Sequence, residues 1–476
     1  MSTYEPVIGL EVHCQLLTKS KLFCGCSTAY GAPPNHHTCP VCLGHPGVLP
    51  VMNEEVLRFA LRIGEALGCT IRETSVFARK NYFYPDLPKG YQVSQYEAPL
   101  CEGGHVDVGE KRFGLTRIHI EEDAGKSVHV EGENVSQVDF NRTGVPLIEI
   151  VSAPDLRSSD EASDYLKELR NVVRYLGISD GHMEQGSFRC DANVSIRRSS
   201  ADPFGTRVEL KNLNSFNHVK RAIDYELARQ AEVLDSGAAV VQETRLWDEK
   251  SGRSRSMRGK EDAHDYRYFP EPDLLPLMVP KAMWDEVKAT LPELPRQRRA
   301  RYVRDLGLGD YDADVLTSDK ALSDYFEAVV ATGAEAKSAA NWVTGELRGR
   351  LNADGKQIEQ SPASPQALGA ILGRLAAGRI SGKIAKDVFA RAYAGEDVAA
   401  VLDAAGEQTS DTSLIEAAVK DVLDANAGEV AKYLDGKTKI FGFFVGKVMA
   451  ATKGKANPSA VNELLTKALD ERREWH

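Results

Sequence analysis

Apolar and polar residues alternate in several short segments of the N-terminal part of the chain. Residues 117–123 read R-I-H-I-E-E-D, and their apolar and polar side chains alternate up to three consecutive acids. A period of two is typical of a β-strand, because successive side chains point to opposite faces of a sheet. Further strands are predicted at residues 7–13, 147–151, 188–196 and 208–211.

These predicted strands carry ionisable residues among their apolar ones. A carboxylate within an apolar strand is costly to bury unless it is paired or binds a cation. For one strand alone, a solvated acid at the edge of a sheet is an equally good explanation. Because several strands share the feature, we predict a sheet face that holds Mg²⁺ and a nucleotide. The candidate catalytic residues are Glu11, His13, Glu122, Glu149, Asp191 and Glu209, with Glu11, His13, Glu122 and Glu149 as candidate Mg²⁺ ligands and Lys211 as a candidate nucleotide-binding cation.

Helical periodicity replaces the strand pattern in the second part of the chain. Amphipathic segments first predict helices at residues 54–67, 159–176 and 217–234, between the predicted strands. From about residue 295, strand-like runs disappear, and Ala, Leu, Lys, Glu and Arg recur at helical spacing. The pattern predicts a first part that combines strands with helices, followed by a helical part. The predicted domains are residues 1–293, 294–405 and 406–476.

Two closely spaced pairs of cysteines follow the first predicted strand. Cys24 and Cys26 form a C-x-C pair, and Cys39 and Cys42 form a C-x-x-C pair. Two such pairs on tight turns can close a tetrahedral four-sulfur site, so we predict a structural Zn²⁺ in a knuckle spanning residues 24–42. The alternatives are four reduced cysteines in a loop, or a histidine in place of one thiolate. The histidines available for this are His36, His37 and His45, and the other four cysteines are expected to be packing residues.

Two segments combine aromatic, proline and charged residues. Residues 79–91 contain Lys80 and Lys89, and their prolines argue against a regular helix or a central strand. They predict a loop that faces phosphates or tRNA, with the two lysines as cations, although a rigid loop packed on a core is the simpler alternative. Residues 242–273 are highly polar and include a second such segment at 265–273, for which a solvated surface is equally compatible.

Composition narrows the class of protein and its partners. The chain has 476 residues, a formal net charge of −10, and no apolar run long enough to cross a bilayer. Its start lacks a basic region followed by an apolar core, so we expect a cytoplasmic protein without membrane contact. The net negative charge argues against non-specific nucleic-acid binding over the whole surface, and we expect no DNA partner.

The C-terminal segment reverses this charge balance. Residues 437–473 contain eight Lys or Arg residues against three acids, and they include the sequence K-G-K at 453–455. A basic pair of helices on an acidic protein predicts contact with an RNA backbone, with a solvated face as the alternative. The G-K-T at residues 436–438 lacks the preceding glycine of a phosphate-binding loop, so a nucleotide would bind through the acidic sheet.

Eight motifs together resemble the B-subunit family of the tRNA-dependent amidotransferases. The resemblance covers essentially the whole chain. The motifs are V-I-G-L-E-V-H (7–13), R-K-N-Y-F-Y-P-D (79–86), H-I-E-E-D-A-G-K (119–126), P-L-I-E-I-V (146–151), R-C-D-A-N-V-S (189–195), E-L-K-N-L-N-S (209–215), D-Y-R-Y-F-P-E-P-D (265–273) and K-G-K-A-N-P (453–458).

The resemblance implies a fold, an activity and partners. It implies an α+β fold, in which a glutamine-synthetase-like cradle with a mixed sheet is followed by an all-α helical domain and a small α-helical tail similar to YqeY proteins. It also implies a heterotrimer with an amidase, the A subunit, and a small C subunit. The B subunit of this family is an ATP- and Mg²⁺-dependent ligase. It phosphorylates the side-chain carboxylate of Glu-tRNA(Gln) or Asp-tRNA(Asn), and ammonia from the A subunit then displaces phosphate. The candidate catalytic residues named above match acidic or metal-site positions of the family motifs, and the cysteine quartet occurs in some members.

Two other classes of protein are compatible with parts of the sequence. One is a stand-alone ligase of the glutamine-synthetase type that acts on a small metabolite, against which the basic helical tail argues. The other is a zinc-containing RNA-binding scaffold without enzymatic activity, against which the acids on successive strands argue.

Phosphoryl transfer needs little covalent chemistry from the protein, which agrees with the lack of an evident Ser or Cys nucleophile.

Overall fold

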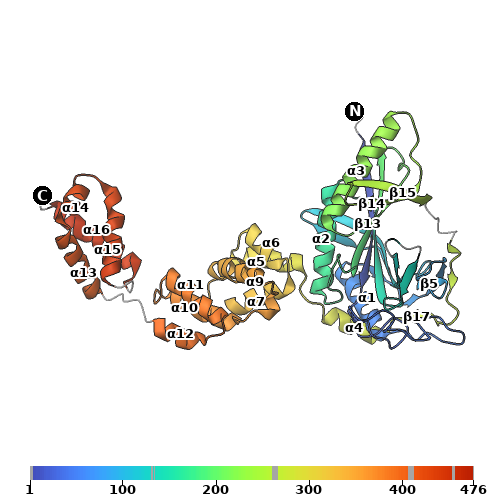
Figure 1. Cartoon of the computed structure of the whole chain (residues 1–476), viewed down its shortest axis with the longest axis horizontal. Helices are drawn as coiled ribbons and strands as arrows, with labels where there is room; N and C mark the ends of the chain where they lie inside the picture. Colours follow the sequence, from blue (N-terminus) through green and yellow to red (C-terminus); the bar gives the residue numbers. More distant parts are fainter. Residues whose placement is uncertain are drawn as a thin grey trace. The chain divides into compact units, whose positions relative to one another are not determined.

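The computed structural model divides the chain into two compact units, Met1–Pro295 and Arg296–His476. It describes residues 4–129, 132, 135–259, 266–405, 412–452 and 456–474 (Figure 1). Each unit has a hydrophobic core of its own, with one cluster in the first unit and two in the second.

The first unit is built on a ten-stranded mixed sheet. Its strand order is β15-β14-β13-β12-β1-β11-β8-β6-β2, with β7 paired to β8. All neighbours are antiparallel except β13 and β14, which are parallel. The strands are β1 (Glu5–Gln15), β2 (Thr70–Ile71), β6 (Cys101–Glu102), β7 (His105–Val108), β8 (Lys111–Glu122), β11 (Pro146–Ser152), β12 (Phe188–Arg197), β13 (Val208–Leu213), β14 (Glu243–Asp248) and β15 (Arg253–Gly259).

Helices cover one face of this sheet and leave the other for polar side chains. Helices α2 (Ser159–Tyr175) and α3 (Phe216–Asp235) pack side by side along the sheet, and α1 (Glu54–Ala66) packs against β8 and α4 (Lys281–Ala289) (Figure 1). In β1, Ile8, Leu10 and Val12 are fully buried. Because side chains alternate, Glu11 and His13 lie on the opposite face.

Three small sheets complete the first unit. They are β16 (Phe269–Pro270), β4 (Ala78–Asn81) and β5 (Tyr91–Ser94), then β9 (Lys126–His129) with β10 (Ser136–Asp139), and β3 (Thr74–Ser75) with β17 (Leu277–Met278). The argument against a central strand in residues 79–91 is wrong for the first of them, since β4 lies between β16 and β5. Pro85 and Pro88 fall in the connection from β4 to β5, where they interrupt no ladder of hydrogen bonds.

The predicted strands and helices of the first unit are confirmed, but helix α4 and many of the shorter strands were not predicted, nor were β14 and β15. The polar segment that begins at residue 242 forms β14 and β15, which extend the main sheet at its edge. Trp247 is the large apolar side chain of β14 and is buried. The many arginines of both strands mask the alternation of apolar and polar residues in the sequence. An edge strand tolerates polar side chains because much of its surface faces water.

The second unit is helical. Its hydrophobic residues form two separate clusters, one drawn from residues between Tyr302 and Leu402 and one from residues between Ile415 and Leu469. No helix among the described residues is both long enough and apolar enough to span a membrane. The helices are α5 (Pro295–Leu306), α6 (Asp310–Thr317), α7 (Lys320–Val330), α8 (Ala336–Asn341), a π-helix (Trp342–Leu347), α9 (Arg348–Ala353), α10 (Pro365–Ala376), α11 (Gly382–Tyr393), α12 (Val398–Ala405), α13 (Thr412–Ala425), α14 (Ala427–Leu434), α15 (Phe441–Ala451) and α16 (Pro458–Glu474).

Candidate functional site

Five neighbouring strands bring ionisable side chains to the face of the sheet that the helices leave open. The register places His13 of β1 opposite Glu149 of β11, and Glu149 opposite His119 of β8. On the other side of β1, Glu11 lies opposite Asp191 of β12. Directly opposed residues of antiparallel strands share a face, so these side chains form a continuous polar row.

His13, Glu121 and Glu149 form one compact group in this row, which we call the acid cluster. His13 Nε2 lies 3.5 Å from Glu121 Oε1 and 3.6 Å from Glu149 Oε2. One ligand atom from each of the three lies within 4.8 Å of the others. His119 lies beside the group, with its Nε2 3.2 Å from Glu149 Oε2. Two carboxylates and one imidazole at this spacing fit a divalent cation that keeps open positions for water or phosphate oxygens.

The three side chains of the acid cluster titrate differently. Burial, together with the neighbouring charge of Glu149, raises the pKa of Glu121 to about 8. Burial acts on Glu149 in the same direction, but His119, His13 and Lys80 outweigh it and hold the pKa of Glu149 well below its ordinary value. Burial lowers the pKa of His13, against the opposing charge of Glu149. A neutral imidazole beside an ionised carboxylate is the state that binds a metal ion.

Lys80 of β4, which the sequence predicted as a cation, interacts electrostatically with both carboxylates of the acid cluster. Burial alone would lower its pKa, but the charges of Tyr268, Glu121 and Glu149 raise it. Its ammonium lies 4.7 Å from the centre of the Tyr266 ring. Lys80 is therefore held as a cation beside two carboxylates, where it can attract a substrate carboxylate or phosphate oxygen.

A second group lies next to the acid cluster on β1, β12 and β13. Lys211 forms an ion pair with Asp191, and its Nζ lies 3.5 Å from Glu209 Oε1. Asn193 Nδ2 donates a hydrogen bond of 2.9 Å to Glu11 Oε1. The structure thus brings four of the sequence-predicted residues together here, with the lysine neutralising two of the three carboxylates.

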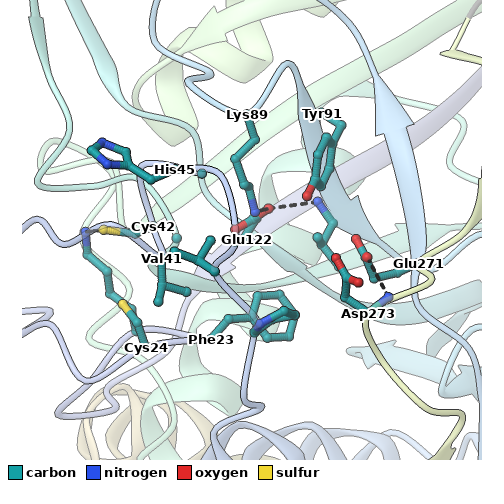
Figure 2. Close-up of a pocket in the computed structure, with 17 residues that line it drawn as sticks. Phe23, Cys24, Val41, Cys42, His45, Lys89, Tyr91, Glu122, Glu271 and Asp273 are labelled. Atoms are coloured by element: carbon teal, nitrogen blue, oxygen red, sulfur yellow. Dashed lines mark hydrogen bonds and ion pairs between the residues drawn. The ribbon is translucent and has the colours of Figure 1, made fainter.

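Glu122 and Lys89 lie apart from both groups. Glu122 Oε1 pairs with Lys89 and accepts a 2.9 Å hydrogen bond from the backbone N–H of Val93. The pair lines a cavity of about 220 Å³. Figure 2 shows this cavity with Cys24 and Cys42 on one side of the pair and Glu271 and Asp273 on the other.

The sequence predicted that Glu122 lies with Glu149, and this prediction is wrong. Glu121, not Glu122, lies beside Glu149 in the structure. Adjacent residues of a strand point to opposite faces, so only one of the two glutamates can share a face with Glu149. The sequence held the signal that would have identified it. His119 and Glu121 are spaced by two, as Glu11 and His13 are, and this pattern places both side chains on the open face.

The four predicted zinc ligands gather in the loop between β1 and α1. One Sγ atom from each of Cys24, Cys26, Cys39 and Cys42 lies within 4.8 Å of the others. Thiolates around Zn²⁺ are about 3.8 Å apart for a tetrahedral site with Zn–S distances of about 2.3 Å, so the set fits this metal. The hydrogen bond from Cys24, with those of Cys39 and the charge of nearby Lys21, lowers the pKa of Cys42 to about 4.

We expect one Zn²⁺ per chain, bound by these four cysteines, and elemental analysis of the purified protein measures it. Cys24→Ser should lose the zinc and lower the thermal stability more than any activity, because a closed four-sulfur site has no open position for substrate. Cys69→Ser, which lies outside the quartet, is the control and should keep its zinc. Less than a tenth of an equivalent of zinc in the wild type would refute the site.

We expect Glu121→Gln to weaken binding of Mn²⁺, as a spectroscopic substitute for Mg²⁺, by at least about tenfold, or roughly 1.4 kcal/mol. Electron paramagnetic resonance titration measures the affinity. Wild-type affinity should rise as the pH rises toward about 8, since Glu121 must lose its proton to become a ligand. Glu122→Gln is the matched control on the opposite face and should bind Mn²⁺ normally. Equal losses in both variants would contradict the separation of the two glutamates.

Two family models match the chain. The model described as the GatB/GatE catalytic domain matches residues 6–285, and the model described as the GatB domain matches residues 324–469. Together they cover the mixed sheet with both groups of ionisable residues and most of the helical second unit.

Curated relatives extend over nearly the full length of the chain. It is 58% identical over 475 residues to the B subunit of the aspartyl/glutamyl-tRNA(Asn/Gln) amidotransferase of Nitratidesulfovibrio vulgaris (strain DP4), with 98% of this chain and 100% of the relative covered. The proteins of the same name from Geotalea daltonii and Solidesulfovibrio magneticus are 57% and 56% identical over 475 residues. These alignments cover 98% of this chain and 99% and 100% of the relatives. The chain therefore belongs to the GatB family of aspartyl/glutamyl-tRNA(Asn/Gln) amidotransferase B subunits.

Proposed function

We propose that this chain activates the side-chain carboxylate of Glu-tRNA(Gln), Asp-tRNA(Asn) or both with ATP, and converts it to the amide with ammonia. The observation that carries the proposal is the acid cluster with Lys80 near it, on the face of the sheet opposite helices α2 and α3. The relatives' name, which is that of the B subunit of an aspartyl/glutamyl-tRNA(Asn/Gln) amidotransferase, supports the choice of substrate.

The proposed reaction has two steps. A side-chain carboxylate oxygen attacks the γ-phosphorus of ATP, the bond to the β-phosphate oxygen breaks, and ADP leaves. The nitrogen of ammonia then attacks the acyl carbon, inorganic phosphate leaves, and the nitrogen gives up a proton to form the amide. Bound Mg²⁺ would neutralise phosphate charge in the first step.

The residues of the polar face have separate roles in this proposal. His13, Glu121 and Glu149 would hold the Mg²⁺, with His119 fixing the orientation of Glu149. Lys80 would draw the substrate carboxylate toward the γ-phosphate. The group of Glu11, Asp191, Glu209 and Lys211 would bind further phosphate oxygens or a second cation.

We propose finer assignments for the domains and partners. Residues 1–293 would be a glutamine-synthetase-like cradle, residues 294–405 a helical domain, and residues 406–476 a tail similar to YqeY proteins. The two separate hydrophobic clusters of the second unit support its division. Ammonia would come from an amidase, the A subunit, in a heterotrimer that also contains a small C subunit, and the complex would act in the cytoplasm.

The function is tested with the complex assembled from this chain and its amidase partners. We expect Glu149→Gln to lower tRNA-dependent ATP cleavage by at least about tenfold, roughly 1.4 kcal/mol of barrier, while the chain stays folded. Glutamine hydrolysis should persist, because that chemistry belongs to the amidase. Assay with both misacylated tRNAs identifies the substrate. ATP turnover at full rate without any tRNA would instead support a ligase for a small metabolite.

We also propose that residues 437–476 bind the body of the tRNA. Lys437, Lys439 and Lys447 lie on or next to α15, whereas the K-G-K at 453–455 lies outside the described residues. The excess of positive charge in residues 437–473 supports this role, and these residues belong to a different compact unit from the acidic sheet.

Deletion of residues 406–476 should therefore weaken binding of misacylated tRNA and flatten its dependence on salt. Each phosphate contact contributes about 0.9 to the slope of log K against log salt. Lys453→Ala with Lys455→Ala should show a smaller change of the same kind. Unchanged affinity at low and high salt, in a deleted complex of the expected size, would show that these lysines only solubilise the helices.

A further inference from the structure

Five tyrosine rings lie in contact beside the acid cluster, on the small sheet β16-β4-β5 and its loops. We call them the tyrosine ladder, and its members in order of contact are Tyr84, Tyr82, Tyr266, Tyr268 and Tyr96. Successive ring centres are 5.9, 6.0, 6.1 and 4.2 Å apart. The first three contacts are edge to face, whereas Tyr268 and Tyr96 are stacked with their planes within 7°.

Backbone contacts hold the ladder in place. Strand β16 pairs with β4, with Phe269 opposite Arg79. Asn81 of β4 donates hydrogen bonds of 3.2 and 2.9 Å to the carbonyl oxygens of Tyr266 and Arg267. Arg267 has a φ of +45°, which side-chain-bearing residues rarely adopt. The Asn81 amide thus fixes a turn that would otherwise be unfavourable, and the rings on both sides of it are preformed.

The inner rings adjoin the acid cluster. Tyr266 lies under the ammonium of Lys80, and burial with the charges of Glu121 and Glu149 raises the pKa of Tyr268 to about 12 against the opposing charge of Lys80. Ser94, two residues before Tyr96, donates a 3.4 Å hydrogen bond to Glu121 Oε2. A ligand that stacks on this part of the ladder would have its neighbouring groups close to the cluster.

The outer side chains are exposed. Tyr84 is 49% and Tyr96 37% accessible to solvent, and Phe83 next to the ladder is 78% accessible. Clusters of exposed aromatic side chains are uncommon on the surfaces of monomeric proteins, and they often mark a binding site. Aromatic rings flanked by lysine are the platform on which the bases of single-stranded nucleic acids stack.

We propose that the exposed rings at the two ends of the tyrosine ladder stack unpaired nucleobases at the 3′ end of the tRNA, and that the terminal adenine stacks on Tyr96, the exposed ring of the Tyr96–Tyr268 stack. This inference rests on the proposed function. The amino acid is esterified to the ribose of that terminal nucleotide. When its side-chain carboxylate reaches the acid cluster and Lys80, the adenine must lie no further away than the span of one aminoacyl-nucleotide.

ATP also carries an adenine, but the arrangement of the rings favours the tRNA. A nucleotide offers one base, whereas the ladder continues from Tyr268 to exposed rings in two separate loops. A strand of several unpaired bases uses such a series of rings, and its backbone can leave along the exposed end. Tyr96 and Tyr268 would thus be positioning residues, which place the terminal ribose without touching the reacting atoms.

The test is a double-mutant cycle on the assembled complex, with uncharged tRNA that has or lacks its 3′-terminal adenosine. We expect removal of this adenosine to weaken binding to the wild type about tenfold, which is within the range for one stacked base. Tyr96→Ala should weaken binding of the full tRNA by a similar factor. Removal of the terminal adenosine should then cause no further loss of tRNA binding in this variant. Tyr96→Phe, which keeps the ring, should behave as the wild type.

Matched measurements separate this role from the alternatives. Tyr311→Ala removes a tyrosine that is 80% exposed in the second unit and should change neither tRNA binding nor its dependence on the terminal adenosine. The KM for ATP should be unchanged in Tyr96→Ala, and its thermal stability should match the wild type.

Three results would overturn the inference. If the losses of tRNA-binding free energy from Tyr96→Ala and from removal of the adenosine simply add, the Tyr96 ring and the terminal adenine do not contact each other. A raised KM for ATP with unchanged tRNA affinity would assign the ring to the nucleotide. Both results require a wild-type complex that amidates misacylated tRNA. A wild-type complex that fails to do so would overturn the proposed function itself, and this inference with it.

Discussion

Ionised side chains on a strand can be kept out of bulk water only if each one has a partner, and the open face of the main sheet satisfies this constraint. Glu149 meets two imidazoles and a lysine, and Lys211 meets two carboxylates. Glu121 lies close to His13 and accepts a hydrogen bond from Ser94, but burial and the like charge of Glu149 still raise its pKa to about 8. Such an acid is suited to bind a cation, because a divalent metal ion replaces the proton and relieves the repulsion between Glu121 and Glu149.

The remainder of the first unit follows from the two faces of this sheet. Helices α1, α2 and α3 bury the apolar face, so the strands are rigid and their register is fixed. That register, rather than any loop, sets the spacing between His13 and Glu149. The small sheet β16-β4-β5 then brings Lys80 and the tyrosine ladder to the edge of the polar row, and Arg79 ties it down through two 2.7 Å hydrogen bonds to Glu271. Chemistry at this face would therefore be performed by side chains that move little.

Much of this arrangement could be predicted from the sequence, because the main strands and helices carry clear periodicity. The gathering of four thiols was also predictable, since C-x-C and C-x-x-C pairs bring sulfurs together through local turns. To choose between Glu121 and Glu122, one must know which residues of β8 point to the polar face of the sheet. Because the two acids are adjacent, one of them points to each face, and the run of acids alone does not show which. The contact of Tyr96 with Tyr268 depends on the pairing of β16 with β4, two strands far apart in the chain, and no local pattern encodes it. The strands β14 and β15, the outermost two at this side of the main sheet, were missed because their many polar residues hide the alternation.

The central claim is that the polar face transfers phosphate to the side-chain carboxylate of the aminoacyl-tRNA. The most direct measurement uses Glu-tRNA(Gln) or Asp-tRNA(Asn) whose side-chain carboxylate is labelled with ¹⁸O, incubated with the assembled complex, ATP and glutamine. Mass spectrometry of the released inorganic phosphate reports the fate of the oxygen. We expect one ¹⁸O atom in phosphate for each amide formed, because the bond between carbon and the labelled oxygen breaks when ammonia displaces phosphate. Amide formation with unlabelled phosphate would contradict it.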